Sequence, residues 1–310
     1  MKVSSQTIIH ECPFAKKTYE IEIYSPLDLV KFLHQNDPSS YEKFVVNIGA
    51  ADGVTGDPCY AIYKEGWPGL AIEGSDNKAL FDNLPQENVK KITNQFCTPF
   101  NIAELLRSGG TPTDFSFLKI DIDGYDGPVL QAILGAGFKP AIIQAEVNQE
   151  IPFPFEFSVS YSEEYIPVYS GPLGTSHTGF HGMSFAYALR IAQAYGYHFV
   201  SASEKYLVDV ILLRNDLAGL FGSKIRSDYE GLREIYFEHP AKPPNLTYFR
   251  HPDPLMAFSW RSRNDYEVLA SELFVKLSEH CRIKHNGKIL PFYFSMHPFA
   301  SMRGLGTSRT

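Results

Sequence analysis

Hydrophobic and polar positions follow a repeated strand and helix pattern along the first two thirds of the chain. Short apolar runs that suit buried strands are each followed by a segment with helical spacing. Because strands that alternate with helices pair in parallel through right-handed crossovers, the pattern predicts an α/β fold with a doubly wound sheet. The predicted strands are 44–48, 69–72, 89–93, 115–124 and 140–147, and the predicted helices are 60–64, 77–84, 102–107 and 128–134.

The pattern changes at the end of this region. A helix over 183–195 stops at Gly196, and two strands follow at 197–203 and 208–214. A connection as short as the one between these strands requires antiparallel pairing. We therefore expect a mostly parallel sheet that ends in an antiparallel hairpin.

Four segments differ in composition. We expect a lead-in element over 1–40, a main domain over 41–216, and a C-terminal extension over 217–310 with a disordered tail. Within the main domain, 149–182 is long, polar and rich in aromatic residues and proline. A segment of this kind inside a compact domain is typical of a substrate-binding insertion.

The first strand opens into a turn of small residues, in the sequence FVVNIGAADGVTG at 44–56. Small residues let the backbone approach a ligand closely, and amides at a helix start suit an anionic or electron-rich group. The dinucleotide fingerprint is not met, since Ala51 stands where its second glycine should be. Asn47, Gly49, Ala51 and Gly53 instead resemble the looser pattern of S-adenosyl-L-methionine (SAM) methyltransferases.

Further candidate cofactor residues follow the next strands. Glu73 ends the second strand, where an acid often accepts hydrogen bonds from ribose hydroxyls. Asn94 and Gln95 follow the third strand and are candidates for contact with adenine. In the glycine turn, Asp52 has two interpretations: it binds the ammonium group of the methionine moiety, or it bonds its own backbone as a turn residue.

Polar side chains also follow the fourth and fifth predicted strands. Asp121 and Asp123 lie around the end of the fourth strand, and Glu146 and Asn148 lie at the end of the fifth. If these strands are neighbours, the oxygens converge in the crevice where α/β sheets bind ligands. Mg²⁺ takes such ligands and lowers the pKa of a bound hydroxyl.

The resulting metal set of Asp121, Glu146 and Asn148 is similar to that of catechol O-methyltransferases, except that Val147 separates the last two residues. In a strand this spacing points both side chains the same way. In the alternative interpretation, Asp121 caps the adjacent turn or binds the cofactor, and Glu146 orients the substrate. His181, in the insertion, is a candidate general base or an exposed loop histidine.

Three segments together resemble FkbM-like SAM-dependent methyltransferases. They are NIGAADG at the first strand, LKIDIDG at 118–124, and the run from QAEVNQEIPF through HGMSFAYALRIAQAYGYHFV to VILLRNDL. The resemblance covers about 40–216 and implies a Rossmann-like sheet of the class I methyltransferase type, with SAM as methyl donor. It also implies O-methylation of a sugar, lipid or secondary metabolite, without fixing the acceptor. The candidate catalytic residues are then Asp121, Glu146 and His181.

Charge and apolar content narrow the partners. The 310 residues carry a net charge of −7, which argues against a nucleic-acid partner. No uninterrupted apolar run reaches the roughly 18 residues of a membrane span, so we expect a cytoplasmic protein that acts on a small molecule away from membranes. A homo-oligomer built through the C-terminal extension is a further expectation.

Two other functions are compatible with the same residues. One is a binding or scaffold protein with a methyltransferase fold and no transfer activity. The other is an N-methyltransferase, although IDIDGYD stands where an amide-nitrogen enzyme would carry an Asn-Pro-Pro-Tyr type motif.

Overall fold

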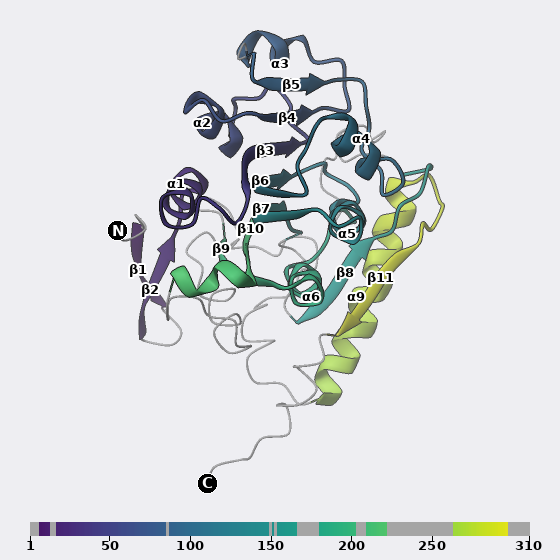
Figure 1. Cartoon of the computed structure of the whole chain (residues 1–310). Coiled ribbons are helices and arrows are strands. Elements are labelled where there is room, and N and C mark those ends of the chain that lie inside the picture. The colour runs from purple at the N-terminus through teal and green to yellow at the C-terminus, as the bar shows by residue number, and fades with distance from the viewer. Residues whose placement is uncertain are drawn as a thin grey trace.

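A seven-stranded sheet forms the centre of the molecule, in a computed structural model that describes residues 6–12, 17–84, 87–148, 151, 154–165, 180–202, 209–221 and 263–296. The strand order is β5-β4-β3-β6-β7-β10-β9, as Figure 1 shows. The bounds are β3 (Glu42–Ile48), β4 (Gly69–Ile72), β5 (Val89–Ile92), β6 (Asp114–Ile120), β7 (Lys139–Glu146), β9 (Tyr197–Ala202) and β10 (Asp209–Arg214).

Strand direction follows the predicted scheme. All neighbouring pairs from β5 to β7 are parallel, whereas β10 is antiparallel to both β7 and β9. The strands β3, β4 and β5 follow one another toward one edge of the sheet, whereas β6 and β7 continue from β3 toward the other edge. Strands β3 and β6 are therefore neighbours, although 65 residues lie between the end of β3 and the start of β6. The predicted fold class, a mostly parallel sheet of the class I methyltransferase type with a terminal hairpin, is confirmed.

Helices cover both faces of the sheet. They are α1 (Pro26–Asn36), α2 (Pro58–Lys64), α3 (Lys78–Asn83), α4 (Ile102–Ser108), α5 (Asp126–Gly135) and α6 (Phe185–Tyr195). Side chains of a strand alternate between faces, so Val46 and Ile48 pack with α4, α5 and α6, while Val45 packs with α1, α2 and α3. The sheet is thus buried on both sides.

Two small antiparallel sheets were not predicted from the sequence. One pairs β1 (Gln6–Cys12) with β2 (Lys17–Ile23), within the expected lead-in element. The other pairs β8 (Phe155–Val159) with β11 (Phe292–Met296). Strand β8 lies in the segment expected to be a substrate loop, and β11 lies in the C-terminal extension.

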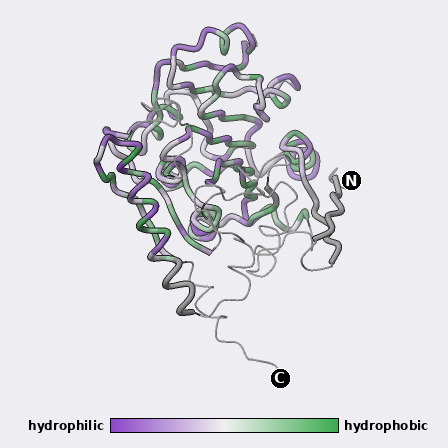
Figure 2. The backbone as a smooth tube through the Cα atoms, turned by 180° about the vertical axis from the view of Figure 1, so that it is seen from behind, coloured by the Kyte–Doolittle hydropathy of each residue, from purple (hydrophilic) through white to green (hydrophobic). Residues whose placement is uncertain are grey.

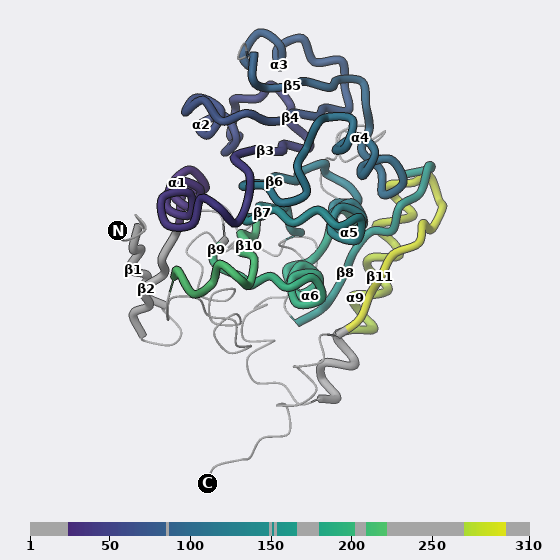
Figure 3. The backbone as a smooth tube through the Cα atoms, in the orientation of Figure 1, coloured from purple at the N-terminus to yellow at the C-terminus, as the bar shows by residue number. Residues whose placement is uncertain are grey.

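The long helix α9 (Arg263–Lys284) packs beside this second small sheet (Figures 1 and 3). The helix lies in the expected C-terminal extension. Its tube carries both hydrophilic and hydrophobic residues in Figure 2. Apolar positions of α9 and β8 form a third core with three neighbouring residues. Its members are Ile151, Phe155, Phe157, Val159, Phe180, Leu273, Leu277, Cys281 and Leu290.

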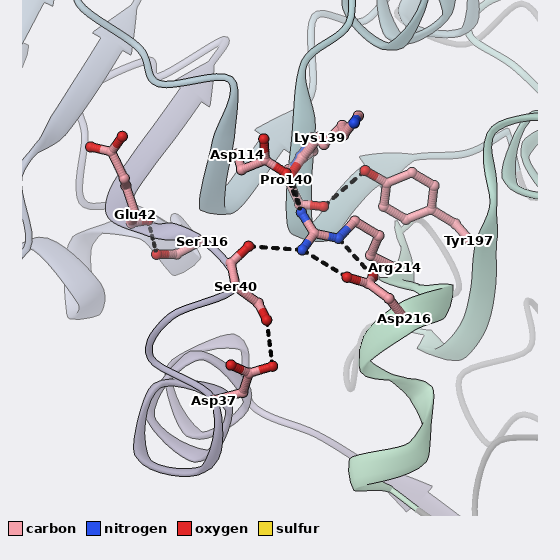
Figure 4. A network of polar contacts seen from close by, with 10 residues as sticks. All are labelled: Asp37, Ser40, Glu42, Asp114, Ser116, Lys139, Pro140, Tyr197, Arg214 and Asp216. Carbon is pink, nitrogen blue, oxygen red and sulfur yellow. Dashed lines mark hydrogen bonds and ion pairs between the residues drawn. The ribbon is translucent and has the colours of Figure 1, made fainter.

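Arg214, the last residue of β10, joins several elements at the edge of the sheet where β6 and β7 begin (Figure 4). Its guanidinium group donates to Asp114 Oδ1 at 3.0 Å, to the Lys139 carbonyl at 2.9 Å and to the Ser40 carbonyl at 3.0 Å. It also binds both carboxylate oxygens of Asp216. With its donors satisfied in this way, Arg214 connects the strand starts to the end of the N-terminal segment.

No helix in the described part of the chain has both the length and the apolar character needed to cross a membrane. The predicted disordered tail and the middle of the predicted insertion, 166–179, lie outside the described residues.

Candidate active site

The glycine turn after β3 is tightly folded against the turn after β6. Gly49, Ala51 and Gly53 all have positive φ, at 77°, 47° and 74°. A Cβ on Gly49 would lie only 1.7 Å from the Asp121 carbonyl oxygen. Because no side chain fits there, only glycine at this position lets the predicted cofactor turn contact the backbone at Asp121.

Glu73 connects the loops after β3 and β4. Its Oε2 accepts a hydrogen bond from the Ala51 amide at 2.8 Å, and its Oε1 accepts from the Ser75 amide at 2.9 Å. The loop after β5 joins them, since the Asn94 amide donates to the Ser75 carbonyl and the Gln95 amide donates to the Glu73 carbonyl. The predicted ribose and adenine residues therefore lie close to the glycine turn.

Two predicted cofactor residues have internal partners instead. Asn47 is fully buried and donates to Asp57, the residue that caps α2. Asp52 accepts from the Val54 amide, the Thr55 amide and the Thr55 hydroxyl, and these bonds, the Thr55 hydroxyl foremost, lower the pKa of its carboxyl group. The geometry at Asp52 matches the turn interpretation.

The acids of the neighbouring strands β6 and β7 do converge. One carboxylate oxygen from each of Asp121, Asp123 and Glu146 lies within 4.8 Å of the others. Asp121 also forms an ion pair at 3.1 Å with the buried Lys119, which donates to the Gly49 carbonyl at 2.9 Å. We call Asp121, Asp123 and Glu146 the acidic cluster.

Two acids of the cluster, Asp123 and Glu146, hold their protons more tightly than exposed carboxyl groups do. Burial, with Asp121 adding to it, raises the pKa of Asp123 to about 6. Burial and then the nearby Asp126 raise the pKa of Glu146 well above its usual range. Within the described residues, Glu146 Oε2 is buried and has no hydrogen-bond partner. A cation or a proton would therefore stabilise this group.

Asp126 was missed in the sequence analysis. It lies in the first turn of α5, is fully buried, and accepts hydrogen bonds from the Ile122 and Gly124 amides at 2.9 and 3.2 Å. Burial raises its pKa to about 7. Its position at a helix start, directly after IDIDGY, is the sequence signal that could have identified it.

His181 and Asn148 meet beside the same edge of the sheet. The Asn148 side-chain amide donates to the His181 carbonyl at 3.0 Å, and the Gly182 amide donates to the Gly124 carbonyl at 2.6 Å. The structure thus brings His181 to the loop that carries the acidic cluster. Asn148 acts here through its amide donor, on the backbone of the histidine segment.

Aromatic rings extend from the acidic cluster to the surface. Tyr125 contacts Tyr165 and Tyr161 edge-on, with ring centroids 5.7 and 5.1 Å apart, and Tyr161 contacts Phe100 at 5.3 Å. Phe100 is 83% exposed, which is unusual for a phenylalanine. Phe100 could not be identified from the sequence, because a lone phenylalanine after a predicted strand carries no distinguishing pattern.

Comparison with solved structures finds only distant similarity. A Lactococcus lactis protein described as a candidate hemolysin shares 12% identity, with 68% of this chain and 94% of that chain covered and a TM-score of 0.38. The 1,6-didemethyltoxoflavin-N1-methyltransferase of Burkholderia thailandensis, with 1,6-didemethyltoxoflavin and S-adenosylhomocysteine bound, shares 12%, covering 61% and 76%, with a TM-score of 0.35. LepI in complex with SAM shares 15%, covering 60% and 46%, with a TM-score of 0.34.

Sequence comparison gives a clearer result. No curated protein matches at a significant level. A sequence model of the family described as Methyltransferase FkbM domain matches residues 38–199, which is more than half of the 310 residues. The matched region contains the glycine turn, Glu73, the acidic cluster and His181. This chain therefore belongs to the FkbM methyltransferase domain family.

Proposed function

We propose that the protein uses SAM to methylate a hydroxyl oxygen of a small polar metabolite or sugar. The observation that carries this proposal is the contact between two half-sites: a cofactor half formed by the glycine turn and Glu73, and an acceptor half formed by the acidic cluster and His181. The glycine turn packs on the Asp121 carbonyl so closely that no side chain fits between them. A donor bound at the turn would therefore have its reactive end beside the acidic cluster.

The cofactor half offers groups that suit SAM. Glu73 is half-buried beside the Ala51 amide, where its carboxylate can accept from ribose hydroxyls. The positively charged sulfonium is stabilised by carboxylates, backbone carbonyls and aromatic faces. Those groups are present in the acidic cluster and in the ring of Tyr125. Asn94 and Gln95 remain candidates for adenine contact.

The acceptor half supplies a base. In the transfer, the acceptor oxygen attacks the methyl carbon, the carbon–sulfur bond breaks with its electrons moving to sulfur, and the hydroxyl proton leaves. A carboxylate with a pKa of about 6, as at Asp123, can take that proton near neutral pH, and Glu146 has a pKa raised in the same direction. His181 is a second candidate base at the same edge.

The acidic cluster also fits a divalent cation. Three carboxylates face one another, and the buried Glu146 Oε2 lacks a partner among the described residues. Asp123 offers an oxygen within 4.8 Å of those of Asp121 and Glu146, so the ligand set we propose takes Asp123 in place of Asn148. Mg²⁺ held there by Asp121, Asp123 and Glu146 would lower the pKa of an acceptor hydroxyl.

Methyl transfer from SAM with a tritiated methyl group to a panel of hydroxylated sugars and phenols tests the proposal, with Mg²⁺ and with EDTA. We expect label in at least one acceptor, a loss of at least tenfold in Asp121→Ala and Glu146→Ala, and no loss in the control Glu104→Ala, an exposed acid on α4. Full turnover in both cluster variants would contradict the assigned site. Label only in amine acceptors would favour N-methylation.

The cytoplasmic location, the absence of a nucleic-acid partner and a homo-oligomer through the C-terminal extension stay predictions from the sequence. Fractionation of cells tests the location, and the mass of the purified protein in solution tests the oligomer.

A further inference from the structure

Lys284, the last residue of α9, lies outside the region that matches the family and yet contacts the candidate active site. Its side chain is buried, at 6% exposure. The ammonium group donates to the Tyr165 hydroxyl at 2.8 Å and to the Phe180 carbonyl at 3.1 Å. It also lies 4.4 Å from the centre of the Tyr165 ring, within cation–π distance.

Both acceptors of Lys284 belong to segments that carry site residues. The Tyr165 hydroxyl donates to the Asp123 carbonyl at 3.1 Å, and its ring packs against Gly124, where a Cβ would lie 3.1 Å from the ring. Phe180 directly precedes His181. One ammonium group thus joins α9 to the loop of the acidic cluster and to the histidine segment.

The charge at this position carries a cost. Neither hydrogen-bond acceptor is a carboxylate, and burial lowers the pKa of Lys284 to about 8, with Asp123 acting in the opposite direction. A buried ammonium bound only by neutral acceptors is less well stabilised than one in water or in an ion pair. An apolar side chain would fill the third core without this cost, so packing alone does not account for lysine here.

We propose that Lys284 is a positioning residue of the methyltransferase site, which holds the Asp123 loop and the His181 segment in place. This inference rests on the proposed function, because it makes the C-terminal segment part of the acceptor side of that site. Cofactor binding at the glycine turn would then be independent of Lys284, whereas the ordering of the acceptor side would depend on it.

A neighbouring lysine provides a matched control. Lys288 also connects the C-terminal segment to the loop before Tyr165, through an ion pair with Glu164 at 2.9 Å. The side chains of Lys288 and Glu164 are both more than half exposed, at 61% and 56%. Exposed pairs contribute little to stability. Lys288→Met therefore removes a link of the same topology without touching the site.

The test is hydrogen–deuterium exchange of the full chain, in peptides that cover 121–126 and 180–184, with S-adenosylhomocysteine titrated separately by calorimetry. The reporter amides are those of Gly124, which donates to the Asp126 carboxylate, and of Gly182, which donates to the Gly124 carbonyl. In Lys284→Met we expect exchange in both peptides to rise at least tenfold. In Lys284→Arg, which keeps the charge, the exchange rates should stay within about threefold of those of the wild type. The exchange rates of Lys288→Met should match those of the wild type.

Three results would overturn the proposal: unchanged exchange in Lys284→Met, equal loosening in the Met and Arg variants, or a uniform rise that includes the core strands β3 and β6. The titration separates this proposal from the proposed function. If the wild type does not bind S-adenosylhomocysteine, the proposed function fails. A local rise in exchange with intact cofactor affinity would support both.

Discussion

At residue scale, Gly49 shows most directly how the two half-sites depend on each other. It has φ of 77°, and its position against the Asp121 carbonyl leaves no space for a methyl group. Gly56, in the same turn region, has a similar φ of 69° but nothing within 4 Å of the place where a Cβ would lie. Substitutions at these two glycines therefore distinguish the effect of a steric clash from the effect of backbone conformation.

We therefore predict that Gly49→Ala destabilises the fold by at least about 3 kcal/mol, because backbone strain and a clash with main-chain atoms add. Gly56→Ala should cost only about 1–2 kcal/mol from the left-handed conformation. Urea unfolding of both variants measures the difference. Equal losses would mean that the turn moves freely away from Asp121.

The buried acids give the stability an uncommon pH dependence. Asp123 and Asp126 have pKa values of about 6 and 7, above the ordinary value near 3.8. The folded protein therefore holds protons at a pH where the unfolded chain has released them. Their contribution to stability is complete below about pH 4 and is lost as the pH rises through 6 and 7.

We predict that Asp126→Asn, which cannot ionise, gains stability relative to the wild type as the pH rises from 5 to 8. Above pH 7 the gap should change by about 1.4 kcal/mol per pH unit. The measurement is urea unfolding at several pH values with EDTA present. A constant gap between the two proteins would show that Asp126 does not titrate in this range.

At the scale of elements, Arg214 determines how the strand starts are held together. A mostly buried guanidinium group joins the beginnings of β6 and β7 to Ser40, which lies just before β3 (Figure 4). Charge-assisted hydrogen bonds of this kind are stronger than neutral ones. The exposed pair between Lys31 and Glu65, at 2.9 Å, offers a comparison in which water competes.

We predict that Arg214→Ala lowers the free energy of unfolding by about 2–4 kcal/mol, and that Arg214→Lys recovers only part because an ammonium group cannot reach the same acceptors at once. Lys31→Ala should cost less than about 1 kcal/mol. Thermal unfolding compares the three. A loss in Arg214→Ala no larger than in Lys31→Ala would rule out Arg214 as a connection between elements.

At the scale of the whole molecule, the third core attaches the C-terminal segment to the catalytic domain. Phe155 and Phe157 on β8 lie in one buried cluster with Leu277 on α9, and β8 pairs with β11 along five residues. The same segment carries Lys284. The acceptor side of the site should therefore lose order together with this core.

We predict that Leu277→Ala, which removes a fully buried side chain, lowers stability by about 2–5 kcal/mol in one cooperative transition. Val275→Ala, at a position that is 63% exposed, should stay within about 0.5 kcal/mol of the wild type. Calorimetric melting distinguishes the outcomes. An early separate transition in Leu277→Ala would show that the third core unfolds independently of the sheet.

The sequence allowed prediction of what depends on neighbouring residues. The turn at Gly49 and the strand before Asp121 follow from local patterns, and so the sheet and the convergence of Asp121 with Glu146 could be expected. The pairing of β8 with β11 joins segments more than 130 residues apart, which periodicity does not encode. Lys284 could not be predicted for the same reason, since its partners are chosen by tertiary packing.

Calorimetric titration with S-adenosylhomocysteine is the decisive test of the proposal that the glycine turn and Glu73 bind SAM. We predict micromolar binding by the wild type, with or without Mg²⁺. We also predict a loss of at least tenfold in affinity in Glu73→Ala, because the carboxylate beside the Ala51 amide would bind the ribose. Absence of binding in the wild type under every condition, or full affinity in Glu73→Ala, would show that this site does not bind SAM as proposed.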